Sequence, residues 1–123
     1  MTDKKKILII DDEPDLVKAL KVRFQNEGYN VISAKDGAEG LEKARKENPD
    51  LIILDLMLPK IDGFRVCRFI KFDESYKHIP IIMLTARIEE EDKKLGFETG
   101  ADYYMTKPFD NQKLMDVIKK FIG

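Results

Sequence analysis

The sequence contains little of what several common protein classes require. It has one cysteine among 123 residues, so no disulfide bond can form within the chain, as suits a reducing compartment such as the cytoplasm. No apolar run approaches the roughly 20 residues that a membrane-spanning helix needs. The formal net charge is −1, whereas a nucleic-acid-binding domain normally has a strongly basic face. We therefore expect a cytoplasmic protein with no membrane segment and no direct nucleic-acid contacts.

Motifs of several enzyme classes are also absent. The seven glycines form neither GxGxxG nor GxxxxGK, the patterns of phosphate-binding loops, and there is no GxSxG serine motif. The single histidine, His78, has no cysteine or histidine companion for a zinc site. Any chemistry therefore has to come from other residues.

Short apolar runs are spaced along the chain. They are Ile7–Ile10, Val31–Ile32, Leu51–Leu54, Ile81–Leu84 and, more weakly, Tyr103–Met105. Most of these runs do not alternate apolar with polar residues, which indicates strands that are buried on both faces of a parallel sheet.

Each run is followed by a segment with helical periodicity. These segments are Leu16–Phe24, Ala38–Ala44, Val66–Ile70, Ala86–Thr99 and Leu114–Phe121. The fourth is weakly patterned because residues 89–94 are all charged, and these charges belong either to a solvated helix face or to a signalling surface. Five β-α units with right-handed crossovers predict an α/β fold in one domain, residues 1–123: a five-stranded, doubly wound parallel sheet with helices on both faces.

Polar residues stand where the predicted strands end. Asp11 and Asp12 follow the first strand, and Asp55 follows the third. Thr85 ends the fourth strand, where it could also cap the next helix, and Lys107 follows the fifth. Because ligands bind at the carboxyl ends of the strands in such sheets, we expect these five side chains to converge.

Three neighbouring carboxylates repel one another, and a divalent cation relieves that repulsion. Mg²⁺ is the natural candidate, because it takes oxygen ligands and is usually held by one or two carboxylates together with phosphate oxygens. An ammonium and a hydroxyl group beside such an ion suit a phosphoryl group, whose charge must be neutralised during transfer. Asp55 is the best candidate nucleophile, because aspartate forms acyl phosphates and because it lies on the central strand.

Together, these residues resemble the receiver domain of bacterial response regulators, the phosphoryl-accepting part of two-component signalling. The resemblance rests on four segments in the same order: DDE after the first strand, LDLMLPKIDG around Asp55, LTA after the fourth strand, and YYMTKPF near the end. It covers essentially the whole chain. It implies a flavodoxin-like sheet with strand order 2-1-3-4-5.

The resemblance also implies a role for each matching residue. Asp55 would accept a phosphoryl group from a sensor histidine kinase or a phosphotransferase. Asp12 would bind Mg²⁺ directly and Asp11 largely through water. Asp55 and the backbone carbonyl of Met57 would complete the metal site.

A conformational switch is implied as well. Lys107 would contact the phosphoryl oxygens, and Pro108 would make the peptide bond between them cis. Thr85 would move its hydroxyl onto the phosphoryl group, and Tyr104 would rotate into the vacated space. The surface of the fourth helix, fifth strand and fifth helix would then change, so that a downstream protein reads the state. A phosphorylation-dependent homodimer would use the same surface.

Two residues bear on the lifetime of the phosphoryl group. Met57 lies two residues after Asp55, and Arg87 lies two residues after Thr85, so both would flank the route of the attacking water. We expect the bulky Met57 to slow hydrolysis. Arg87 would change the rate in either direction if it reaches the phosphoryl group.

Two other functions are weighed against this one. A pseudo-receiver would be an interaction domain that is never phosphorylated, and the complete set of acids, threonine and lysine counts against it. An aspartate-nucleophile phosphohydrolase would usually carry a second aspartate at the position of Met57, together with a larger substrate pocket. We therefore predict a switch that catalyses its own phosphorylation and dephosphorylation without being a conventional enzyme.

Because the chain ends with its last predicted helix, we expect no output domain in it, whether it is a stand-alone regulator or a part of a longer one.

Overall fold

The five apolar runs form the five strands of one parallel sheet. The computed structural model describes residues 4–86 and 89–123. The strands are β1 (Lys6–Ile10), β2 (Asn30–Ala34), β3 (Leu51–Leu54), β4 (Ile81–Thr85) and β5 (Tyr103–Thr106). Their order in the sheet is β2-β1-β3-β4-β5, and all pairs are parallel, so the predicted doubly wound α/β fold and its strand order are confirmed.

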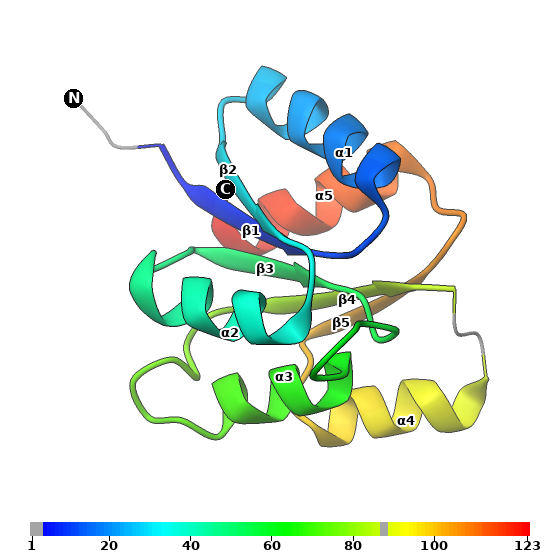
Figure 1. Ribbon diagram of the computed structural model, residues 1–123. Coiled ribbons are helices and arrows are strands. Elements are labelled where there is room, and N and C mark those ends of the chain that lie inside the picture. The colour runs from blue at the N-terminus through cyan, green and yellow to red at the C-terminus, as the bar shows by residue number, and fades with distance from the viewer. Residues whose placement is uncertain (1–3, 87–88) are drawn as a thin grey trace.

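Helices cover both faces of this sheet. They are α1 (Pro14–Asn26), α2 (Gly37–Lys46), α3 (Gly63–Lys71), α4 (Glu90–Glu98) and α5 (Asn111–Ile122). Figure 1 shows α1 and α5 on one face, and α2, α3 and α4 on the other. Within the described part of the chain, no helix combines the length and the apolar character needed to cross a membrane.

The continuous apolar runs are explained by two separate cores. Alternate side chains of β1 point to opposite faces, so Ile7 and Ile9 pack in the core that contains Phe24 of α1. Leu8 and Ile10 pack in the other core with residues of α2 and α3, such as Val66. A strand between two layers of helices therefore needs apolar residues at every position.

Aspartates start three of the helices by accepting hydrogen bonds from free backbone N–H groups. Asp36 caps α2, Asp62 caps α3, and Asp110 caps α5. The fourth helix is different: α4 begins at Glu90, with Glu89 at its N-cap position. Thr85 therefore does not cap it, because β4 includes Thr85 as its last residue.

Candidate functional site

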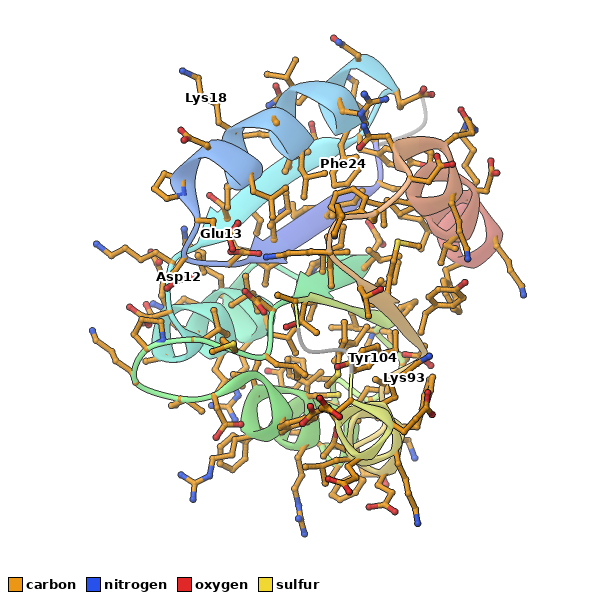
Figure 2. All side chains as sticks on the ribbon, turned by 90° about the vertical axis from the view of Figure 1, so that its right-hand side faces the viewer. Asp12, Glu13, Lys18, Phe24, Lys93 and Tyr104 are labelled. Atoms are coloured by element: carbon orange, nitrogen blue, oxygen red, sulfur yellow. The ribbon has the colours of Figure 1, made fainter. Side chains whose placement is uncertain are left out.

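The carboxyl ends of β1 and β3 bring three acidic side chains together. Parallel pairing places Ile10 beside Leu54, so the residues that follow them in each strand are neighbours. Asp11, Asp12 and Asp55 each offer a carboxylate oxygen, and these oxygens lie within 4.8 Å of one another. Figure 2 looks onto this edge of the sheet and shows Asp12 at its rim. Asp11 and Asp55 are buried, whereas Asp12 is exposed.

Backbone hydrogen bonds hold the two buried aspartates in place. The amide of Asp11 donates to the carbonyl oxygen of Ala34 at 3.1 Å, and the amide of Asp55 donates to that of Ile10 at 3.0 Å. Their side chains accept in turn: Asp11 Oδ1 from the amide of Glu13 at 2.9 Å, and Asp55 Oδ1 from the amide of Met57 at 3.3 Å. In each carboxylate, a hydrogen bond from a backbone amide two residues later therefore orients one oxygen.

Lys107 follows the edge strand β5, and its side chain reaches the acidic groups at the ends of β1 and β3. Its amide donates to the carbonyl oxygen of Thr85 at 2.8 Å, which extends the β4–β5 pairing by one residue. Its ammonium group donates to Asp11 Oδ2 at 2.9 Å and to Asp55 Oδ2 at 3.3 Å. The peptide bond between Lys107 and Pro108 is cis, as the resemblance implied.

Glu13 is a member of this cluster to which the sequence analysis assigned no role. Its carboxylate lies 3.3 Å from the ammonium group of Lys107, and its side chain is 57% exposed. The only signal in the sequence is its place as the third acid of the DDE segment. Figure 2 shows Glu13 reaching inward from the start of α1, toward the centre of the site.

The cluster has more negative than positive charge: the Lys107 ammonium group pairs with three carboxylates, and a fourth, that of Asp12, lies beside Asp11 and Asp55. Burial raises the pKa of Asp11 above its ordinary value, even though hydrogen bonds from Lys107 and the Glu13 amide favour the carboxylate. Burial also opposes the charge of Lys107, but Asp11, Asp55 and Glu13 outweigh it and raise the pKa of the lysine. The lysine therefore stays charged, and a bound cation would favour the charged form of Asp11, which burial opposes.

The donor set fits Mg²⁺, because every candidate ligand is an oxygen and the three carboxylates already lie close together. Met57, two residues after Asp55, is 59% exposed. A hollow lined by Asp12, Met57 and Asp62 opens beside the acids. Of the three acids, Asp12 is the one that lines this hollow.

Thr85 and Tyr104 lie on the neighbouring strands. Thr85 is completely buried at the same edge as the acids. Tyr104 is 7% exposed, pairs in register with Met83 and lies against α4, where its ring centre is 6.5 Å from that of Phe97. Thr85 thus lies at the edge of the acids, and Tyr104, on the neighbouring strand, lies on the α4 side of the sheet. Arg87, the other residue assigned to the acceptor's surroundings, lies outside the described residues.

Comparison with known proteins gives one consistent result. Residues 7–119 match the family described as the response regulator receiver domain. The chain is 49% identical over 118 residues to the alkaline phosphatase synthesis transcriptional regulatory protein PhoP of Bacillus subtilis. The aligned residues cover 96% of this chain and 48% of that protein. It is 44% identical over 117 residues to the DNA-binding dual master transcriptional regulator RpaA of Synechocystis, covering 95% of this chain and 48% of that protein.

A solved structure shows the same fold. The chemotaxis protein CheY4 of Vibrio cholerae superimposes with a TM-score of 0.90 at 32% sequence identity, covering 98% of this chain and all of that one. The chain spans about half the length of the two transcriptional regulators that it matches.

Proposed function

Because the chain belongs to the response regulator receiver family, we propose that it is the phosphorylation-dependent switch of a two-component system, with Asp55 as the acceptor. The observation that supports this proposal best is the position of the Lys107 ammonium group, which bridges the buried carboxylates of Asp11 and Asp55 beside the exposed Asp12. A sensor histidine kinase or a phosphotransferase would be the donor.

Asp55 is the most suitable nucleophile of the three acids. It lies at the end of the central strand β3, and its two carboxylate oxygens have different partners, the Met57 amide and the Lys107 ammonium group. In the transfer, one of these oxygens forms a bond to phosphorus while the bond from phosphorus to the donor's leaving atom breaks. The leaving group keeps that electron pair, and Asp55 becomes an acyl phosphate.

Asp12, Asp55 and the carbonyl oxygen of Met57 would hold Mg²⁺, with Asp11 acting largely through water. When bound, Mg²⁺ supplies positive charge to the phosphoryl oxygens. Lys107 would then exchange part of its bonding to the two aspartates for the new phosphoryl oxygens, which are stronger acceptors. Glu13 would keep the ammonium group near the edge of the site, since it is bonded there already at 3.3 Å.

The readout would pass through Thr85 and Tyr104. We infer that the Thr85 hydroxyl turns toward the phosphoryl group and that the Tyr104 ring moves with it. Tyr104 lies against α4, where Leu95 and Phe97 are 42% and 51% exposed, so its movement changes an apolar surface. Lys93 and Tyr104 line one hollow of this face together (Figure 2). A downstream protein or a second copy of the chain would bind this α4-β5-α5 surface.

The output of the switch is proposed from the relatives. PhoP and RpaA are both named as transcriptional regulators, so we propose that this domain controls such an output through protein contacts, not as an enzyme and not by touching DNA itself. We propose the reducing cytoplasm as its location, because the single cysteine, Cys67, allows no disulfide bond within the chain.

Incubation with acetyl phosphate and Mg²⁺ tests the proposal. We expect one phosphoryl group per chain, stable enough to be seen in the intact mass, and no modification of the Asp55→Asn variant or of wild type in excess chelator. A protein that never reacts would be a pseudo-receiver. Rapid release of phosphate over many turnovers would instead indicate a phosphohydrolase, which the methionine at position 57 argues against.

A further inference from the structure

The connection between β3 and α3 contains the acceptor at its start and is folded tightly. We call residues 55–62 the acceptor loop. The amides of Leu58 and Gly63 both donate to the carbonyl oxygen of Leu56, at 3.2 and 2.9 Å, and the amide of Ile61 donates to that of Pro59 at 2.9 Å. The acceptor loop is therefore made of successive tight turns, so we expect a displacement at its tip to move the residues near its start as well.

Gly63 closes the base of the acceptor loop. A Cβ atom at this position would lie 2.2 Å from the carbonyl oxygen of Asp55 and 2.6 Å from Cα of Leu56. Helix α3 thus begins directly against the backbone of the acceptor. Only a residue without a side chain fits there.

Gly37, the first residue of α2, closes the tip of the acceptor loop from a different part of the chain. Its amide donates to the carbonyl oxygen of Pro59 at 3.2 Å. A Cβ atom on Gly37 would lie 1.9 Å from the carbonyl oxygen of Ile61, which is a backbone atom and cannot rotate away. A weaker link lies beside it, since the Lys60 ammonium group is 3.6 Å from the carboxylate of Asp36.

We propose that Gly37 is a positioning residue for the Mg²⁺ site. By letting α2 approach the acceptor loop, it fixes the loop that contains Met57, whose carbonyl oxygen is a metal ligand under the proposed function, on which this inference rests. Gly37 contacts the tip of the loop through Pro59 and Ile61 and is not itself one of the candidate metal ligands. Its effect on the metal is therefore indirect.

The size of the effect follows from the geometry. Real Cβ atoms essentially never come closer than 3.0 Å to such neighbours, so an alanine at position 37 would move the helix or the loop by about 1 Å. Loss of a group that orients a metal ligand typically weakens metal binding by about 10–100-fold. We expect a change in this range for Gly37→Ala.

Gly40 offers a matched control in the same helix. A Cβ atom there would lie 2.7, 2.8 and 3.0 Å from Cδ1, Cγ2 and Cγ1 of the buried Ile10, so it meets side-chain atoms of the core where a Cβ atom on Gly37 meets backbone atoms of the acceptor loop. Gly40→Ala therefore disturbs the core under α2 without pressing on the acceptor loop. Both substitutions replace glycine by alanine in α2, so a general loss of helix packing would appear in both.

Calorimetric titration of Mg²⁺ into wild type, Gly37→Ala and Gly40→Ala tests the proposal. We expect the Kd of Gly37→Ala to rise at least about tenfold and that of Gly40→Ala to stay near wild type. Excess Mg²⁺ should restore reaction of Gly37→Ala with acetyl phosphate. Equal Kd values for the two variants would overturn the inference while leaving the proposed function intact. A wild type that binds no Mg²⁺ would overturn both.

A second measurement needs no variant and covers the case in which Gly37→Ala does not fold. Because coupling between two sites is reciprocal, Mg²⁺ bound by wild type should tighten the contact of α2 with the acceptor loop. In NMR spectra, the Gly37 amide should shift and exchange more slowly with solvent when Mg²⁺ is added. The Gly40 amide, which donates to the carbonyl oxygen of Asp36 at 2.9 Å, should not change. An unaffected Gly37 amide would refute the proposed coupling.

Discussion

Replacing Asp12 by asparagine is expected to remove the effect of Mg²⁺ on stability without lowering the stability of the metal-free protein. Asp12 is exposed, and Lys107 pairs with Asp11, Asp55 and Glu13 instead. Its carboxylate lies within 4.8 Å of two others, where each repulsion amounts to about 1 kcal/mol in a water-like dielectric. The metal-free Asp12→Asn protein should therefore be as stable as wild type or more stable by up to about 2 kcal/mol.

In the presence of Mg²⁺, wild type should instead be more stable than Asp12→Asn. At a concentration of about 100 times Kd, a bound ion stabilises the folded protein by about 2.7 kcal/mol, which for a domain of this size raises Tm by about 10 °C. A site that is weakened about a hundredfold would gain only about 0.4 kcal/mol at the same concentration.

Thermal unfolding with and without Mg²⁺ measures both effects. Asp15→Asn is a suitable control, because Asp15 is also an exposed aspartate but lies within the first turn of α1, outside the acidic cluster. The control should gain as much from Mg²⁺ as wild type. Equal stabilisation of Asp12→Asn and wild type would show that Asp12 is not a metal ligand, and the absence of any effect on wild type would refute the metal site.

Three further predictions concern other parts of the chain. Met57→Ala should release phosphate from phosphorylated Asp55 faster than wild type, because a bulky side chain no longer obstructs the attacking water; an unchanged rate of phosphate release would remove this role for Met57. Asp110→Ala should lower the free energy of unfolding by about 1 kcal/mol, as measured by urea denaturation, because the Asp110 carboxylate accepts from the amides of Gln112 and Lys113 at the start of α5; an unchanged midpoint would contradict the cap. Burial raises the pKa of the Cys67 thiol to about 11 from 9.0, so the folded state keeps this proton to a higher pH than the unfolded state, and the free energy of unfolding should fall as the pH rises from about 9 to about 11. Wild type should lose more stability over this range than Cys67→Ala, and equal losses would show that the buried thiol is not responsible.

The strands and the convergence of the site could be predicted because both depend on local features of the sequence. Residues buried on two faces leave uninterrupted apolar runs, as in Leu51–Leu54, and the carboxyl ends of parallel strands always share an edge. The contact of Lys107 with Asp11 and Asp55 follows from these two rules once the strand order is known.

Other features depend on tertiary contacts that no local pattern shows. Glu13 reaches Lys107 across 94 positions of the chain, and its place at the start of α1 is equally suitable for a solvated acid. The close packing of Gly37 against Ile61 brings together the start of α2 and the acceptor loop, which are distant in sequence. A glycine at the start of a helix does not indicate which residue will pack against it. The start of α4 was predicted too early, at Ala86, because the charged residues 89–94 give little periodicity.

The most direct test of the account is to find which residue receives the phosphoryl group. Wild-type protein is treated with acetyl phosphate and Mg²⁺, reduced with borohydride, which converts an aspartyl phosphate to homoserine, and digested for peptide mass mapping. We predict that homoserine appears at position 55 alone, and that it is absent when Mg²⁺ is withheld or Lys107 is replaced by alanine. Modification of another aspartate, or of Asp55 to the same extent in all three samples, would contradict the proposed site.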